Sequence, residues 1–160
     1  MKQKRLIKKP SITIRINNRY IKNKDLQILV SLVKIAQRAS SLFLDIRECT
    51  ISSQTTKVIF KTLQNFKNLS NLKITFGGDY GVANDTVFME LYRSLSKLKK
   101  LVALRFWICG QQNSLTNRSL ISLGKVLEYH KLQELDLAIF SEELSINGEG
   151  FERFTKSLRA

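Results

Sequence analysis

Cysteine, proline and histidine are scarce in this chain of 160 residues, which contains two, one and one of them. Two cysteines, Cys49 and Cys109, cannot supply a disulfide framework or a four-ligand zinc site, so we expect no metal and no cofactor. The single histidine, His130, stands at a helix position that is apolar in other copies, so we do not expect it to act as the base of a catalytic triad, and we expect no enzymatic activity. His130 instead matches the partly buried apolar positions Phe66 and Leu98.

Long apolar runs are also missing, since no segment approaches the roughly 18 apolar residues of a membrane-spanning helix. We therefore expect no membrane partner. The basic N-terminus has no apolar core segment of the kind found in secretory signals. Together with the few cysteines, this indicates an intracellular protein, first of all cytoplasmic, with the nucleus and the mitochondrion as alternatives.

Acidic residues are absent from the first 24 positions, which contain nine Lys or Arg, whereas residues 128–160 contain seven acids and four Lys or Arg. Residues 1–10 are predicted to form a flexible basic arm that ends at Pro10, the only proline. Its cationic residues are Lys2, Lys4, Arg5, Lys8 and Lys9. The arm suits nucleic-acid phosphates, an acidic protein surface or an import receptor, and a merely solubilising tail is the alternative. Without aromatic residues or a nucleic-acid motif, phosphate contact would be non-specific.

What the chain does contain is an apolar pattern that occurs five times. Matching positions are Ile14, Leu44, Leu72, Leu104 and Leu135, then Ile21, Ile51, Ala83, Leu115 and Ile146, then Leu29, Ile59, Leu91, Leu123 and Phe154. The last two sets advance by 30, 32, 32 and 31 residues. A period in this range predicts a row of stacked structural units.

Each unit is predicted to be a strand, a turn and a helix. In the second copy, Leu44 and Ile46 alternate with polar residues as on a strand with one buried face, and Ile59 and Leu63 have helical spacing. Ser52 and Ser53 stand where the helix needs an N-cap, and the same offset gives Asn23, Asp85, Asn117 and Gly148. The predicted units span approximately residues 11–40, 41–68, 69–100, 101–131 and 132–160.

The expected fold is therefore an α/β solenoid of about five units, with a parallel sheet on its concave face and helices on its convex face. A doubly wound sheet is the alternative, but it needs strands that are apolar on both faces, and these strands are one-sided. Three longer loops are expected near residues 76–82, 108–114 and 139–145, clustered on one rim.

The motifs Leu69-x-x-Leu72-x-Ile74, Leu101-x-x-Leu104-x-Phe106-x-x-Cys109 and Leu132-x-x-Leu135-x-Leu137 resemble the signature of leucine-rich-repeat proteins, in particular the ribonuclease-inhibitor-like subclass. The resemblance covers residues 11–160. Cys49 and Cys109 occupy the family's buried Asn/Cys ladder position, which is Arg19, Gly77 and Phe140 in the other copies. Ser11 and Ser41 replace the first Leu in the first two copies. The resemblance implies a scaffold that recognises macromolecules, mostly proteins, and is rarely catalytic.

Side chains between the core positions of the strands are expected to lie in rows on the concave face. The predicted rows are Arg15, Asp45, Lys73, Arg105 and Asp136, then Asn17, Arg47, Thr75, Trp107 and Ala138, then Thr13, Phe43, Asn71, Ala103 and Glu134. From them we select the candidate partner-binding residues Trp107, Arg105, Arg47, Lys73, Arg15 and Phe43. The alternatives are a solvated, self-neutralising face, a Trp107 packed under the next loop, and a buried Phe43.

The last unit ends with the apolar residues Phe151, Phe154 and Leu158 and no polar capping unit. This pattern indicates a fragment, a dimer or a subunit of an assembly that uses the C-terminal face. The function we expect is a non-enzymatic scaffold that binds a protein, predicted to be acidic, through the concave face and long loops. An RNA-associated basic subunit of a large assembly is the alternative. A regulator of a GTPase or ubiquitin pathway rests only on family analogy.

Overall fold

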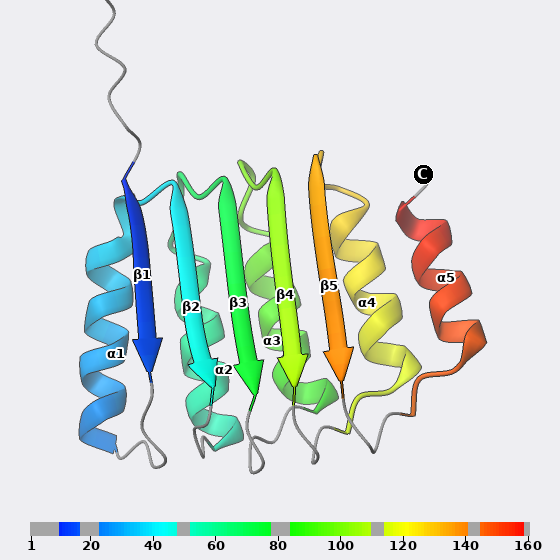
Figure 1. The fold of residues 1–160 in the computed structure, drawn as a ribbon, viewed down its shortest axis with the longest axis horizontal. Helices are drawn as coiled ribbons and strands as arrows, with labels where there is room; N and C mark the ends of the chain where they lie inside the picture. Colours follow the sequence, from blue (N-terminus) through cyan, green and yellow to red (C-terminus); the bar gives the residue numbers. More distant parts are fainter. Residues whose placement is uncertain are drawn as a thin grey trace, which may run out of the picture.

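The structure, a computed structural model, describes residues 10–16, 23–47, 52–77, 84–109, 114–140 and 145–158. Strands and helices alternate along the chain (Figure 1). The strands are β1 (Ser11–Ile16), β2 (Ser41–Arg47), β3 (Asn71–Gly77), β4 (Ala103–Cys109) and β5 (Glu134–Phe140). The helices are α1 (Asn23–Ile35), α2 (Ser53–Leu63), α3 (Asp85–Leu95), α4 (Asn117–Leu127) and α5 (Gly148–Leu158), and a short 3-10 helix, η1 (Ala36–Arg38), follows α1.

The five strands form one parallel sheet in the order β1-β2-β3-β4-β5, so that neighbours in sequence are neighbours in space. Figure 1 shows all five helices on one face of this sheet. The α/β class, the parallel sheet and the five strand–helix units agree with the prediction. We call the sheet face without helices the open face.

The core lies between the sheet and the helices and continues from one unit to the next. Leu44, Ile74 and Phe106 contribute fully buried strand side chains. Phe88 of α3 packs edge-on against Phe106 of the next strand, with ring centroids 5.4 Å apart, and against Phe60 of the preceding helix at 6.4 Å. Each unit therefore buries its apolar face against its neighbours.

The register between β2 and β3 differs from the predicted rows by two residues. Leu44 is paired with Ile74, whereas the sequence pattern matched it to Leu72. The same shift puts buried Ala39, and not Ser41, at the position of Leu69. Side chains alternate with a period of two along a strand, so a slip of two residues keeps every apolar residue on the core face. The hydrophobic pattern could not detect this error.

The corrected register changes the rows of the open face. One row is Thr13, Phe43, Lys73, Arg105 and Asp136, and the next is Arg15, Asp45, Thr75, Trp107 and Ala138. The third row, at the start of the strands, is Ser11, Ser41, Asn71, Ala103 and Glu134. The predicted row that joined Arg15 and Asp45 to Lys73 is therefore wrong, although the Arg15–Asp45 neighbourhood is confirmed.

Of the two cap candidates in the second copy, Ser52 is confirmed, and the other caps that the structure describes lie one residue before the predicted positions. Ser52, Asn84 and Thr116 are the N-cap residues of α2, α3 and α4, and each side chain accepts a hydrogen bond from a backbone N–H of the first turn. Asn147 acts in the same way before α5 by accepting from the Gly150 N–H. The predicted caps Asp85, Asn117 and Gly148 are instead the first residues of their helices. Asn23 likewise begins α1.

The prediction of a buried ladder position at Cys109 is also wrong. Cys109 is the last residue of β4, and its side chain is exposed, because it points to the open face. Its row partner Gly77 lies so close that an added Cβ would be 2.5 Å from the backbone oxygen of Cys109. Cys49 lies outside the described residues. The predicted long loops begin too early, since residues 76–77, 108–109 and 139–140 belong to strands.

The last unit of the row is less buried than the units in its middle. Leu135 and Leu137 on β5 are only half-buried, whereas Leu104 and Phe106 on β4 are 1% exposed. Phe151 and Leu158 are exposed, as expected for an uncovered face, but Phe154 is buried against the core. Within the parts of the chain that the structure describes, no helix has the length and apolar character needed to cross a bilayer.

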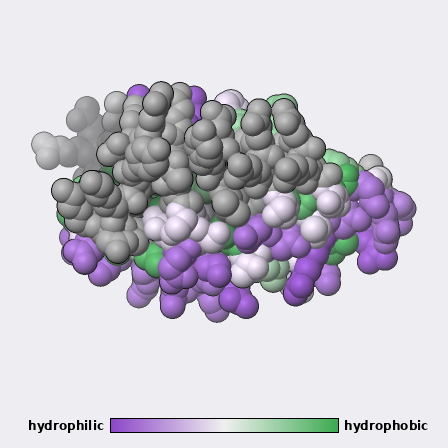
Figure 2. Space-filling view, turned by 90° about the horizontal axis from the view of Figure 1, so that it is seen from below, coloured by the Kyte–Doolittle hydropathy of each residue, from purple (hydrophilic) through white to green (hydrophobic). Residues whose placement is uncertain are grey.

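Hydrophilic residues predominate along one long edge of the molecule when it is viewed from the rim at which the strands end. Figure 2 shows this edge, with hydrophobic residues between the hydrophilic ones. Such a surface is typical of a region that faces solvent.

Candidate partner-binding face

The centre of the open face is a cation held between two aromatic rings. The Lys73 Nζ lies 4.7 Å from the ring centroid of Phe43 and 4.7 Å from that of Trp107. Phe43 is the direct neighbour of Lys73 in its row, and Trp107 lies diagonally across from it on β4. Cation–π attraction therefore fixes three of the predicted binding residues in one group. We call Phe43, Lys73 and Trp107 the aromatic–lysine group.

Trp107 is 37% exposed even with the Lys73 ammonium group over its ring. It is the only tryptophan of the chain. A large aromatic side chain that is held in place but still reaches solvent is typical of a binding anchor. The loop under which Trp107 was alternatively expected to pack, residues 110–113, lies outside the described residues. Phe43 was expected to be either an exposed binding residue or a buried one, and it is half-buried.

A second group, towards β1, is arranged around a buried carboxylate. The Asp45 side chain is 0% exposed and accepts hydrogen bonds from the Arg47 Nε at 2.7 Å and the Arg15 Nε at 3.2 Å. The Arg47 hydrogen bond outweighs burial and lowers the pKa of Asp45 below its usual value. The two arginine side chains remain 55% and 57% exposed, so both stay accessible to a partner.

Arg105, on the other side of the aromatic–lysine group, is paired with Glu134 of β5. The Arg105 Nε donates to the Glu134 Oε1 at 2.6 Å, across a diagonal between the two strands. Among the residues that the structure describes, the open face thus presents four cations and three carboxylates. The cations are Arg15, Arg47, Lys73 and Arg105, and the carboxylates are Asp45, Glu134 and Asp136. The predicted self-neutralisation is present, with a net excess of one positive charge.

A shallow cavity of about 260 Å³ lies where the strands begin. Its polar lining includes Ser41, Asn71, Lys73, Arg105 and Glu134, and Phe43 contributes an apolar wall. A hollow with an aromatic wall and both donors and acceptors can receive a polar side chain of a partner.

All six residues that the sequence selected therefore lie on the open face. The structure brings Phe43, Lys73 and Trp107 into contact, with Arg105 beside Lys73 in its row, and it collects Arg15 and Arg47 around Asp45. The five cationic residues of the predicted arm lie outside the described residues.

Sequence reasoning missed Phe140 as a member of this face. Phe140 ends β5 next to Cys109 in its row and diagonal to Trp107, and it is 64% exposed. The strand alternation Asp136, Ala138, Phe140 could have placed it there. It was instead assigned to a ladder position of the resembled family.

A network between units was also missed. The Asp85 carboxylate accepts hydrogen bonds from the backbone N–H of Thr116 at 3.0 Å, from its hydroxyl at 2.7 Å, and from the Ser119 hydroxyl at 2.6 Å. Burial raises the pKa of Asp85, but the Ser119 and Thr116 hydrogen bonds outweigh it and lower the pKa below its usual value. One unit later, Asn117 stands at the position of Asp85 and Asn147 at that of Thr116, and these two residues also form two hydrogen bonds with each other. These contacts link neighbouring units at the starts of their helices.

His130 does not belong to the open face. It lies in the turn after α4, half-buried as expected, and burial lowers its pKa. The described residues contain no group of three or more His, Cys, Asp or Glu arranged to hold a metal ion.

The fold is similar to that of a solved structure of the leiomodin-1 actin-binding site 2 (ABS2), with a TM-score of 0.61. The two share 17% sequence identity, and the match covers 92% of this chain and 78% of that chain. At this identity the similarity shows the fold alone. No model of a known protein family matches the chain, and no curated protein matches it.

Proposed function

We propose that the chain is a leucine-rich-repeat solenoid of the ribonuclease-inhibitor-like kind that binds a partner protein through its open face and has no catalytic activity. The observation that carries this proposal is the aromatic–lysine group. Lys73 fixes Phe43 and Trp107, and Trp107 remains accessible to a partner. Binding energy at protein interfaces is concentrated in such central aromatic and arginine residues.

The repeat assignment is supported by the chain-order sheet, by the helices on one face and by contacts that recur at the unit spacing, such as Asp85–Thr116 and Asn117–Asn147. The structural similarity to an actin-binding site supports protein recognition as the use of a fold of this kind. Actin is therefore one defined protein to test as a ligand.

An acidic partner surface fits the charges of the open face. Arg15 and Arg47 both pair with Asp45 and keep more than half of their side-chain area exposed. A carboxylate of the partner could therefore approach the exposed part of these two side chains. The same guanidinium groups would also bind phosphates, so the experiment must distinguish protein binding from an RNA-associated function.

The test is affinity capture from a lysate, followed by crosslinking mass spectrometry. It compares the unchanged chain with Trp107→Ala and with Tyr129→Ala, which removes an 83%-exposed aromatic residue outside the open face. A third variant lacks residues 1–9. The proposal expects proteins that the unchanged chain and Tyr129→Ala both capture, that Trp107→Ala loses, and that crosslink to Lys73.

Two results would count against the proposal. Capture that is identical for Trp107→Ala and Tyr129→Ala would show that the open face is not the binding surface. Capture that is lost after nuclease treatment, or that falls by orders of magnitude between low and physiological salt, would favour the RNA-associated function.

A further inference from the structure

The C-terminal end face, defined by Phe151, Leu158 and the edge strand β5, exposes positions that are buried in the preceding units. Phe151 and Leu158 are 53% and 41% exposed. At the unit spacing, Phe151 corresponds to Leu120 and Phe88, which are each 1% exposed. Leu158 corresponds in the same way to Leu127, Leu95 and Leu63, which are 2%, 1% and 0% exposed.

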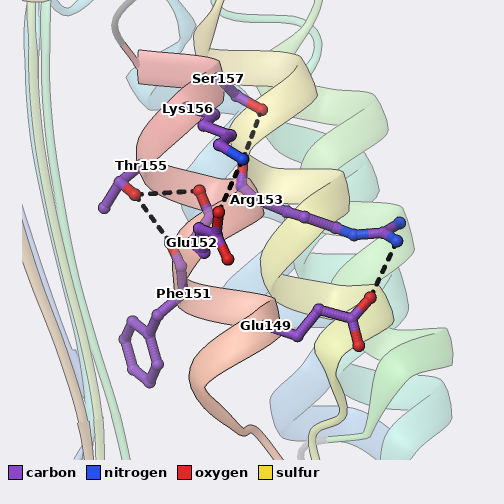
Figure 3. Close-up of polar contacts among 7 residues, drawn as sticks. All are labelled: Glu149, Phe151, Glu152, Arg153, Thr155, Lys156 and Ser157. Carbon is purple, nitrogen blue, oxygen red and sulfur yellow. Dashed lines mark hydrogen bonds and ion pairs between the residues drawn. The ribbon is translucent and has the colours of Figure 1, made fainter.

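Phe151 and Leu158 are more exposed than their equivalents because, in the preceding units, the next strand–helix unit covers these positions. Phe88 packs against Phe106 of the next strand, with ring centroids 5.4 Å apart, and α5 has no such neighbour among the described residues. Figure 3 shows the Phe151 ring pointing away from the two ion pairs of α5, Glu149–Arg153 and Glu152–Lys156. The C-terminal end face is therefore shaped to receive another strand–helix unit.

The N-terminal end face, defined by Ile28, Leu32 and the edge strand β1, is the complementary surface. Leu32 is 46% exposed, whereas its equivalents Thr62 and Ser94 are 7% and 0% exposed and Val126 is half-buried. Its equivalent in the last unit, Ser157, packs against the preceding helix, since a Cβ on Gly124 would lie 3.0 Å from the Ser157 Cβ. Leu32 thus points to where a preceding helix would lie, and Ile28 extends the apolar surface with 59% exposure.

The first and last parts of the sequence are opposite in net charge, and of the nine N-terminal cations Arg15 and Lys24 lie within the described residues. Residues 1–24 contain nine Lys or Arg and no acid, and residues 128–160 contain seven acids and four Lys or Arg. If β1 of one copy continued the sheet beyond β5 of another in the same register, Arg15 would lie diagonally across from Asp136. The Arg105–Glu134 pair already spans a diagonal of this kind. Two C-terminal end faces placed together would instead bring Glu134 and Asp136 against like charges.

We propose that copies of this chain associate head to tail, with the C-terminal end face of one copy covered by the N-terminal end face of the next. The junction repeats the internal contact between units, with β1 added in parallel to β5 and α1 packed against α5. Such a contact is heterologous, because it joins two different surfaces, and it leaves a free face at each end for further copies.

The experiment is sedimentation velocity of the full chain from low micromolar to several hundred micromolar concentration. It includes Leu32→Glu, which places a charge in the N-terminal end face, and Phe151→Glu, which does the same in the C-terminal end face. Tyr129→Glu, at an exposed position of neither face, is the control, and circular dichroism checks that every variant is folded.

The unchanged chain and Tyr129→Glu should form dimers and larger species as concentration rises. Each end-face variant alone should associate at least about tenfold more weakly, because its charge would be buried unpaired at the junction. An equimolar mixture of Leu32→Glu and Phe151→Glu should form one-to-one dimers, because each variant keeps the face that the other has lost.

Three outcomes would overturn the proposal. The first is an unchanged chain that stays monomeric at every concentration. The second is a Leu32→Glu variant that associates as well as the unchanged chain, which would indicate pairing of two C-terminal end faces. The third is a mixture of the two variants that shows no dimer.

Discussion

Replacement of Asp85 by alanine should destabilise the protein more than any change at an exposed residue. Asp85 is the first residue of α3. Its carboxylate accepts three hydrogen bonds from the following unit, two from Thr116 at 3.0 and 2.7 Å and one from Ser119 at 2.6 Å. Ser119 is 2% exposed, so its hydroxyl would lose a charged acceptor that water cannot easily replace. Hydrogen bonds to charged groups are worth about 1.5–3 kcal/mol each, and a buried donor left unsatisfied costs about 1–3 kcal/mol.

These contributions overlap, and Asp85 is itself only half-buried, so we expect a loss of about 3 kcal/mol in the free energy of unfolding. Asp85→Asn keeps the shape and one acceptor oxygen, and it should lose about half as much. The assay is urea unfolding at pH 7, followed by circular dichroism and extrapolated linearly to water. Glu152→Ala on the exposed surface of α5 is the control and should leave the unfolding curve nearly unchanged.

If Asp85→Ala unfolds within about 0.5 kcal/mol of the unchanged chain, the network between units does not stabilise the fold. A loss of the same size in Asp85→Asn and Asp85→Ala would show instead that the charge, and not the number of acceptors, carries the effect.

Three further predictions concern the open face. Gly77→Ala should lose about 1–3 kcal/mol in urea unfolding, because the new Cβ would lie 2.5 Å from the backbone oxygen of Cys109; wild-type stability would contradict this close approach. Lys73→Met should shift the fluorescence of Trp107, because it removes the ammonium group that lies 4.7 Å from the ring centroid. Lys73→Arg keeps a cation at this position and should change the fluorescence less. Identical spectra for the unchanged chain and both variants would refute the contact. Because the pKa of Asp45 is lowered in the folded protein, its carboxylate stabilises the fold above its unfolded pKa, and this stabilisation is lost as the pH falls through the folded pKa. Asp45→Asn should therefore weaken the decrease of the free energy of unfolding at acidic pH. The same decrease in Asp45→Asn and in the unchanged chain would contradict the role of this carboxylate.

The alternation of strands and helices could be predicted because each unit repeats its own hydrophobic periods. Leu44 and Ile46 alternate with polar residues, and Ile59 and Leu63 follow the helical spacing, so local pattern and packing agree. The identity of the paired residues could not be predicted in the same way. A strand shifted by two residues has the same buried face, and only the packing of β2 against β3 distinguishes Ile74 from Leu72 as the neighbour of Leu44.

The candidate face was predicted by residue but not by contact. Trp107, Lys73 and Phe43 were assigned to three different rows, and the corrected register brings them together around one ammonium group. Asp45 was expected to face solvent in its row. It is fully buried on the open face because two long arginine side chains cover it, and a pattern of polar and apolar residues does not contain that information.

The most direct test of the open face as a protein-binding surface is the affinity of one captured protein for three versions of the chain. The unchanged chain, Trp107→Ala and Tyr129→Ala are titrated with that protein at physiological salt. An anchor of this kind contributes about 2 kcal/mol or more, which corresponds to a dissociation constant about 30-fold higher for Trp107→Ala. Tyr129→Ala should stay within about twofold of the unchanged chain. Equal affinities for the unchanged chain and Trp107→Ala would contradict the account.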